Sequence, residues 1–344
     1  MSKKNICILI DGISNSGGTD RVAASISNIF IVLGNQVSIF SLNEGMPFYE
    51  MNSKVNLFYS KSKNRFWKLV DAVSHVKKVI YDYVIIISMG RLSAQIIPLL
   101  RFSKVTSSII CSDHVSIESF PFYIRCIKYI AYRLSSKIVV LTAHDKFFLS
   151  RWFRKDKIHI IRNESPYCLE NIDCKEKVVI AVGRLTYQKN FHRLLNIWKR
   201  IKNEEWSLVI IGDGEERDNL RECIESNSIK NVTILPPTNE LIVWYRKASL
   251  LLMTSRYEGL PMVLIESKSF GIPVIAFDCK TGPREIIKDD GFLIDYDDDG
   301  TFLKHVENLL SDEQLRNKLA RNALKNAYEY SHSSITNQWE KIIN

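Results

Sequence analysis

Long apolar runs are missing from this sequence of 344 residues. Its longest ones, such as residues 83–88 and 249–253, have the length of buried strands, whereas a membrane-spanning helix needs roughly 18–20 apolar residues. The short apolar run that follows the first four residues is ended by Asp11. We therefore expect neither a membrane-spanning helix nor a signal peptide.

Cysteine pairing is also missing, because no two of the seven cysteines form a C-x-x-C pair. This spacing argues against a disulfide framework and a structural zinc site, and it favours a reducing cytoplasm. The cysteines are Cys7, Cys111, Cys126, Cys168, Cys174, Cys223 and Cys279. With 46% hydrophobic and 25% charged residues, the composition is that of a globular protein and excludes collagen, coiled coil and disorder.

Negative charge is scarce in the first half of the chain. Residues 1–170 contain 23 Lys and Arg against 12 Asp and Glu, whereas residues 171–344 contain 24 against 26. The net charge of +9 therefore arises in the first half. This asymmetry indicates that the first half meets something anionic, such as nucleic acid, a phosphorylated substrate or a lipid surface.

Short β-branched runs alternate with longer amphipathic segments, which is typical of parallel βαβ units. The predicted strands are residues 5–10, 36–41, 83–88, 106–111 and 137–141, then 177–182, 207–211, 232–235, 249–254, 273–276 and 292–294. The predicted helices are residues 21–33, 66–80, 93–100, 123–134 and 143–153, then 190–201, 215–227, 240–246, 262–270, 283–287, 299–310, 311–330 and 334–343. The pattern restarts near residues 163–166, so we predict two doubly wound α/β domains, 1–165 and 166–328, facing a cleft.

Three loops at the ends of predicted strands could carry chemistry. In the first, residues 11–20, Gly17 and Gly18 stand before a helix, where backbone can approach an anion closely, although a plain strand–helix turn explains them equally well. In the second, residues 183–190, Arg184 and Lys189 could neutralise a diphosphate, the alternative being a solvated basic loop.

The third loop, residues 255–266, places Glu258 and Glu266 on either side of a turn into a helix. Both carboxylates could accept hydrogen bonds from the hydroxyls of a sugar and a ribose, or they could be an ordinary surface Glu and a helix charge. The intervening residues shape the turn or offer backbone N–H groups to an anion. They are Gly259, Leu260, Pro261, Met262 and Val263.

The third loop is similar to the E-x7-E segment of retaining glycosyltransferases of family 4, which have the GT-B fold of two Rossmann-like domains. The resemblance covers nearly the whole chain in the expected order. Its other motifs are residues 17–21 (Gly-Gly-x-Glu-Arg in the family, with Asp20 here), 160–163 with Pro166, 183–185, 188–190, 212–214 and 281–286. The family's C-terminal helix crosses back to the first domain, which is what we expect of residues 329–344, the alternative being a helix packed on its own domain.

The resemblance implies a role for each matching residue. Arg184 and Lys189 would hold the nucleotide diphosphate, which Gly17 or Gly18 would approach from the first domain. The base would lie near Pro236. Glu258 would contact the donor sugar, Glu266 the ribose, and the backbone of residues 259–263 the phosphate or sugar. His114 resembles the first-domain histidine at the reacting face of the sugar, although a lone histidine is more often structural.

We expect no metal and no cofactor apart from the UDP-sugar donor. Residues 295–299 contain a D-x-D pattern, which in another glycosyltransferase fold holds a divalent cation, but here the aspartates precede a helix and are better explained as its caps. The chain also lacks a P-loop and a G-x-S-x-G nucleophile elbow.

Residues 65–78 and 146–157 interleave aromatic and basic side chains, which suits an anionic bilayer surface, although the aromatics could equally belong to the core. The same pattern could stack bases, but no nucleic-acid module is present, and we expect no nucleic-acid partner. In the resembled family the first domain takes the acceptor, often a polyprenyl-diphosphate-linked sugar or a lipopolysaccharide. We expect a cytoplasmic enzyme held peripherally at the inner membrane.

The sequence thus predicts a retaining, metal-independent hexosyltransferase that moves a hexose or N-acetylhexosamine from a UDP-sugar to a lipid-linked or saccharide acceptor in bacterial O-antigen, capsule or exopolysaccharide synthesis. Two alternatives remain open. One is a sugar-nucleotide epimerase or a phosphorylase of similar two-domain shape. The other is a non-catalytic protein that binds anionic lipid or nucleic acid.

Overall fold

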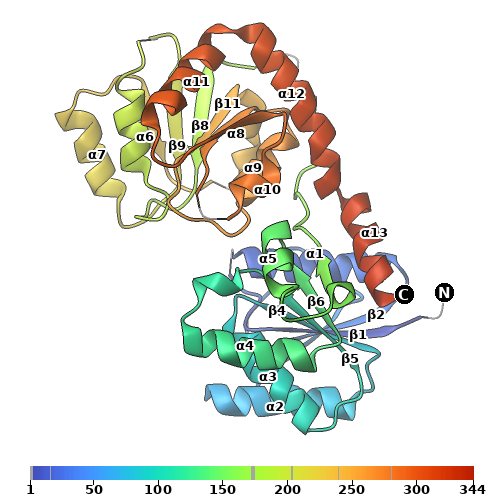
Figure 1. Cartoon of the computed structure of the whole chain (residues 1–344). Helices are drawn as coiled ribbons and strands as arrows, with labels where there is room; N and C mark the ends of the chain where they lie inside the picture. Colours follow the sequence, from blue (N-terminus) through green and yellow to red (C-terminus); the bar gives the residue numbers. More distant parts are fainter. Residues whose placement is uncertain (1–2, 16, 172–174, 203, 239, 280) are drawn as a thin grey trace. The chain divides into compact units, whose positions relative to one another are not determined.

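The computed structural model describes residues 3–15, 17–171, 175–202, 204–238, 240–279 and 281–344, and it divides into two compact units (Figure 1). Unit 1 comprises Met1–Glu164 and Ile335–Asn344, and unit 2 comprises Ser165–Ser334. The boundaries predicted from the sequence fall after residues 165 and 328. Among the cysteines, Cys174 lies outside the described residues, and the six described ones are free thiols.

Unit 1 is built on a parallel sheet with the strand order β3-β2-β1-β4-β5-β6-β7. The strands are β1 (Asn5–Ile10), β2 (Gln36–Ser41), β3 (Asn56–Tyr59), β4 (Tyr83–Ser88), β5 (Ser108–Asp113), β6 (Lys137–Val140) and β7 (Ile158–Ile160). The helices are α1 (Gly18–Val32), α2 (Arg65–Lys78), α3 (Arg91–Phe102), α4 (Phe122–Leu134) and α5 (Ala143–Leu149), with short 3-10 turns η1 (Ile117–Ser119) and η2 (Lys155–Lys157).

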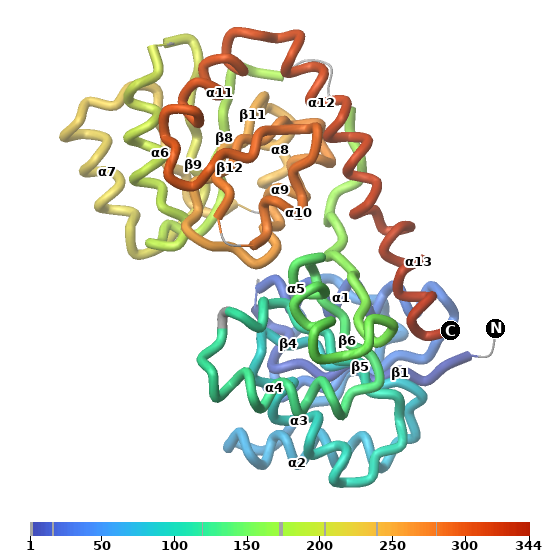
Figure 2. Tube along the Cα trace, in the orientation of Figure 1, coloured from blue at the N-terminus to red at the C-terminus, as the bar shows by residue number. Residues whose placement is uncertain are grey.

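Alternate side chains of the central strand β1 enter two separate cores, as the strand period requires. Ile8 packs with α1 and with α13 (His332–Ile343), whereas Leu9 packs with α2, α3 and α4. Trp339 of α13 meets Phe30 of α1 edge to face, with 5.7 Å between ring centroids. In Figure 2 the red end of the trace accordingly runs beside the blue α1. The end of the chain is therefore part of the unit 1 core.

Unit 2 repeats the scheme with the strand order β10-β9-β8-β11-β12-β13. The strands are β8 (Val178–Val182), β9 (Ser207–Ile211), β10 (Val232–Leu235), β11 (Leu250–Met253), β12 (Val274–Phe277) and β13 (Gly291–Ile294). The helices are α6 (Phe191–Trp198), α7 (Arg217–Ser226), α8 (Leu241–Lys247), α9 (Met262–Lys268), α10 (Pro283–Ile286), α11 (Asp299–Ser311) and α12 (Glu313–Ala327), with the 3-10 turn η3 (Tyr328–Tyr330).

Both sheets are parallel, so the loops that follow their strands gather at one edge of each unit. The α/β fold and the doubly wound sheets predicted from the sequence are confirmed. Among the described residues, no helix combines the length and the apolar character needed to cross a bilayer.

Candidate active site

Two of the predicted donor-binding side chains form an ion pair in unit 2. Lys189 Nζ lies 2.6 Å from Glu258 Oε1, and the side chains are 17% and 7% exposed. Lys189 follows β8 and Glu258 follows β11, and these strands are neighbours in the sheet. An ammonium that bonds one carboxylate keeps further donor hydrogens for another oxygen. The pair can therefore offer a cation to a phosphate and an acceptor to a hydroxyl at one place.

Arg256, which the sequence analysis did not single out, ties the two loops together. Its Nη2 donates to Asn190 Oδ1 at 3.0 Å, and its Nε donates to the carbonyl of Tyr187 at 3.1 Å. Gln188 Nε2 donates in the other direction, to the carbonyl of Tyr257 at 2.9 Å. Asn190 adopts the left-handed conformation with φ 55°. These bonds hold the backbone on both sides of the Lys189–Glu258 pair, so its geometry is set by the loops and not by the side chains alone.

The loop of Glu258 is also supported from the start of α10. Thr281 Oγ1 donates to the carbonyl of Glu258. Gly282 has φ 86°, and a Cβ there would lie 2.7 Å from the carbonyl oxygen of Gly259 and 2.8 Å from Pro261 Cδ. Only glycine combines that conformation with that approach. The segment that resembles a family motif therefore packs directly on the Glu258 turn.

Glu266 lies on α9 and is 5% exposed. Its Oε2 accepts a hydrogen bond from Tyr245 OH at 2.7 Å, which fixes the direction of the carboxylate. The preceding turn carries the other predicted residues: Leu260 and Pro261 are buried, whereas Gly259, Met262 and Val263 are half-buried. Helix geometry directs the N–H groups of the first turn of α9 back toward this turn.

The other residues of unit 2 that were predicted to bind the donor lie at the same edge of the sheet but not at the ion pair. Arg184 is exposed and follows Gly183 at the end of β8. Pro236 is exposed at the end of β10, an edge strand that β9 and β8 separate from β11. The structure thus brings Lys189 and Glu258 together and leaves Pro236 away from them.

In unit 1, the loop after β1 leaves open space at Gly18. Gly18 is exposed at the first position of α1, and a Cβ there would have no atom of the described residues beyond its chain neighbours within 4 Å. Gly17 precedes it with φ −73°, which any residue adopts. Asp20 is buried, and its Oδ2 accepts a hydrogen bond from the backbone N–H of Asn15 at 2.8 Å. This aspartate, which stands where the resembled family has the longer glutamate, therefore bonds within its own loop. No contact with the residues that the structure describes requires glycine at residue 18.

His114 follows β5 directly, and its backbone N–H donates to the carbonyl of Ser88 at 3.0 Å. Its Nε2 lies 3.2 Å from Ser112 Oγ, and its Nδ1 is buried. Burial lowers the pKa of His114 to about 4, against the opposing influence of the Asp113 charge. The ring is therefore neutral near pH 7, with one nitrogen able to donate and the other able to accept.

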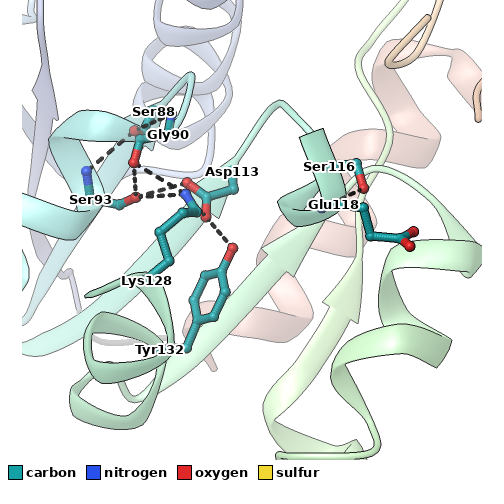
Figure 3. Close-up of polar contacts among 8 residues, drawn as sticks. All are labelled: Ser88, Gly90, Ser93, Asp113, Ser116, Glu118, Lys128 and Tyr132. Atoms are coloured by element: carbon teal, nitrogen blue, oxygen red, sulfur yellow. Dashed lines mark hydrogen bonds and ion pairs between the residues drawn. The ribbon is translucent and has the colours of Figure 1, made fainter. Parts of the chain in front are cut away.

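Asp113 lies at the centre of a buried polar network that the sequence analysis missed (Figure 3). Its Oδ2 lies 2.8 Å from Lys128 Nζ and 2.5 Å from Tyr132 OH, and its Oδ1 accepts from Ser93 Oγ at 2.9 Å. Lys128 also donates to the carbonyl of Gly90 at 3.2 Å. The network joins the loops after β4 and β5, so it supports the backbone that carries His114. A single lysine in the apolar run of α4 was the signal that could have revealed it.

One of the aspartates of residues 295–299 caps α11, as predicted, and another forms an ion pair. Asp298 caps the helix by accepting from the backbone N–H of Thr301 at 2.8 Å, and Asp299 pairs with Arg193 at 2.6 Å. Across the part of the chain that the structure describes, no group of three or more His, Cys, Asp or Glu side chains gathers as metal ligands would.

Comparison with known proteins places this geometry in context. The family model described as glycosyl transferases group 1 matches residues 170–326. The amylovoran biosynthesis glycosyltransferase AmsD of Erwinia amylovora is 44% identical over 98% of this chain and 99% of its own length. A Campylobacter jejuni enzyme, named GalNAc-alpha-(1->4)-GalNAc-alpha-(1->3)-diNAcBac-PP-undecaprenol alpha-1,4-N-acetyl-D-galactosaminyltransferase, is 28% identical over 96% of this chain and 95% of its own. The solved structure of Anabaena HepE with UDP has the same fold, with a TM-score of 0.82 at 16% identity, over 98% of this chain and 99% of that one.

Proposed function

Because this chain belongs to the family glycosyl transferases group 1, we propose that it moves a hexose or an N-acetylhexosamine from a UDP-sugar to a lipid-linked or saccharide acceptor during the synthesis of a bacterial surface polysaccharide. The chain is a glycosyltransferase with the GT-B fold. The UDP in the HepE structure supports the choice of nucleotide, and the undecaprenol in the name of the Campylobacter enzyme supports a lipid-linked acceptor.

The observation that carries this proposal is the ion pair of Lys189 and Glu258. In the proposed complex, Lys189 and the exposed Arg184 bind the diphosphate, and Glu258 accepts a hydrogen bond from a sugar hydroxyl. Charge builds up on the diphosphate as its bond to the sugar breaks, and preplaced cations stabilise that charge. The N–H groups of Met262 and Val263 contribute in the same sense, and Glu266 accepts from the ribose. Lys189 thus stabilises the leaving diphosphate and also holds Glu258, the residue that orients the sugar.

Unit 1 supplies two further contributions in this proposal. Gly18 leaves room for a phosphate against the start of α1, a helix of 15 residues whose first N–H groups favour an anion. His114, neutral near pH 7, hydrogen-bonds the sugar at its reacting face. Neither His114 nor Glu258 is assigned as a covalent nucleophile.

The proposed reaction retains the configuration of the sugar and needs no metal. The bond between the anomeric carbon and the diphosphate oxygen breaks, and the acceptor hydroxyl forms the new bond from the same face. The hydroxyl proton passes to the departing diphosphate, which Arg184 and Lys189 hold in place. We further propose that the enzyme works peripherally at the inner membrane, since unit 1 carries the positive charge of the chain and the aromatic and basic segments 65–78 and 146–157.

A turnover screen tests the proposal directly. The purified protein is incubated in EDTA with UDP- and GDP-sugars, with and without polyprenyl-diphosphate-linked sugars. Acceptor-dependent release of UDP from one donor is expected. The Glu258→Gln variant should lose this activity, whereas Glu205→Gln, a change at an exposed surface pair, should not. Release of GDP would overturn the nucleotide, and activity only after added Mg²⁺ would overturn metal independence.

Two outcomes would favour the alternatives. Conversion of a UDP-sugar without any acceptor would indicate an epimerase, and phosphate-dependent cleavage of a saccharide would indicate a phosphorylase. Absence of turnover, with Glu258→Gln binding donor like the parent, would refute the enzymatic proposal for this site. Salt-sensitive binding of anionic lipid or nucleic acid would then be the remaining function.

A further inference from the structure

An apolar stripe on α4 is left uncovered in unit 1. Phe122, Tyr123, Ile127 and Ile130 are 80%, 65%, 43% and 54% exposed. At 3.6 residues per turn these positions share one side of the helix. The opposite side of α4 packs on α3 and is buried. The exposure therefore belongs to one continuous face and not to scattered side chains.

The stripe continues onto α5 and the segment that follows it. The ring of Tyr129 lies 5.6 Å from the ring of Trp152, which is itself 68% exposed, and Phe147 is 63% exposed. We call this set, Phe122, Tyr123, Ile127, Ile130, Phe147 and Trp152, the α4 surface. A run of large exposed apolar side chains rimmed by polar ones marks a surface that binds a partner or a membrane.

The charge around the α4 surface is mostly positive, and its acidic neighbour Glu118 is paired with His144. Helix α4 has no acidic residue, and Arg133 is exposed on the same side as the stripe. Arg151 and Lys155 are exposed beside Trp152, whereas Arg154 is paired with Asp156. A second copy of this chain would bring the same positive charges face to face, which disfavours self-association through this surface. A bilayer with anionic headgroups complements both the apolar stripe and its basic rim.

We propose that the α4 surface docks unit 1 on an anionic lipid bilayer, with the aromatic and aliphatic side chains in the headgroup region and the basic rim on the lipid phosphates. This extends the membrane contact from segment 146–157, which supplies Phe147 and Trp152, to α4, a helix outside the two basic segments named from the sequence. Only seven residues of the chain lie between His114 and Phe122, so the α4 surface begins close in sequence to the predicted reacting histidine. The inference rests on the proposed function in one respect only, that the acceptor is lipid-linked.

Vesicle co-sedimentation tests the proposal. The full chain is mixed with vesicles of phosphatidylcholine alone and of phosphatidylcholine with phosphatidylglycerol. We expect binding to the anionic vesicles, and about a tenfold loss of partition for the triple variant Phe122→Ser, Ile127→Ser, Ile130→Ser, since apolar burial is removed. The matched control replaces three other exposed apolar residues of unit 1, Val32, Ile80 and Phe102, which are 70%, 89% and 80% exposed. It should bind like the parent.

Several results would overturn the proposal: no binding of the parent to anionic vesicles, equal loss in the control variant, or a dimer in light scattering that the triple variant abolishes. Thermal melts confirm that the variants fold, and the single change Phe122→Ser serves if the triple variant does not. Turnover of a short-chain, water-soluble acceptor separates this test from that of the proposed function. The triple variant should retain this turnover. If the proposed function is wrong, the parent protein will show no turnover but will still bind the vesicles.

Discussion

Replacing Gly18 with alanine separates a ligand-binding role from a structural one. The added methyl would meet no atom within 4 Å in the described part of the chain beyond its immediate neighbours, and the residue occupies the first position of α1. Alanine is favoured over glycine inside a helix by about 0.5–1 kcal/mol, so the free energy of unfolding should stay level or rise by up to that amount. If the fold required glycine at this position, Gly18→Ala would instead lower the free energy of unfolding.

The expected effect on catalysis is a loss. If the backbone at Gly18 approaches the diphosphate, the methyl occupies that space and weakens a hydrogen bond to a charged group, which contributes about 1.5–3 kcal/mol. Since about 1.4 kcal/mol corresponds to a tenfold change in rate, kcat/KM for the donor should fall by about ten- to a hundredfold. The loss should appear at low donor concentration, where binding limits turnover.

The assay is steady-state UDP release at subsaturating donor, combined with urea denaturation of the same preparations. Gly212→Ala is the control, because a Cβ there would lie 1.9 Å from the carbonyl oxygen of Gly183. That variant should lose stability, whereas Gly18→Ala should not. Parental kcat/KM in Gly18→Ala would refute the assignment of this loop to the donor.

Three further predictions concern ionisable side chains that are largely buried. Lys189→Met, which leaves Glu258 without its partner, should lower kcat/KM about a hundredfold and lower the free energy of unfolding by about 3 kcal/mol, measured by UDP release and urea denaturation; Lys189→Arg should recover part of both. Lys128→Met should lower the free energy of unfolding, measured by urea denaturation, by about 3–5 kcal/mol, because it leaves the buried carboxylate of Asp113 without its cation. Adding Asp113→Asn should restore most of that loss. If the effects of the two changes were simply additive, the pairing would be contradicted. Burial lowers the pKa of His114 to about 4, whereas the unfolded chain titrates near about 6.5, so stability should fall as pH drops from about 6.5 to about 4. The His114→Gln variant should lose that part of the pH dependence in urea melts at pH 7 and pH 5, and an unchanged slope would argue against a buried neutral ring.

The interior strands were predictable because a strand buried on both faces appears as an uninterrupted apolar run. The interior strands β1, β2, β4 and β9 have the predicted bounds, and so does the edge strand β10. The edge strands β3 and β7 escaped prediction, since β3 alternates exposed and half-buried residues and β7 has only three residues. β5 ends two residues later than predicted, which brings Asp113 into the strand and places His114 directly after it.

The site was predictable as far as motifs reach. Resemblance indicated Lys189 and Glu258 separately, yet their direct contact depends on the pairing of β8 with β11, because they are 69 positions apart along the chain. Arg256, Lys128 and Tyr132 carry no motif, and their functions appear only through the hydrogen bonds that they make. Contacts between residues so far apart in the chain cannot be inferred from the local sequence.

The sequence by itself determined the fold class, the family and the candidate residues, because apolar periodicity and loop motifs are local properties of the chain. Only the tertiary structure decided which polar groups meet and which apolar side chains remain outside the core. Helix α4 shows the reason: it is apolar on nearly every side, and only its packing on α3 reveals that Tyr132 is buried whereas Phe122 and Ile130 face outward.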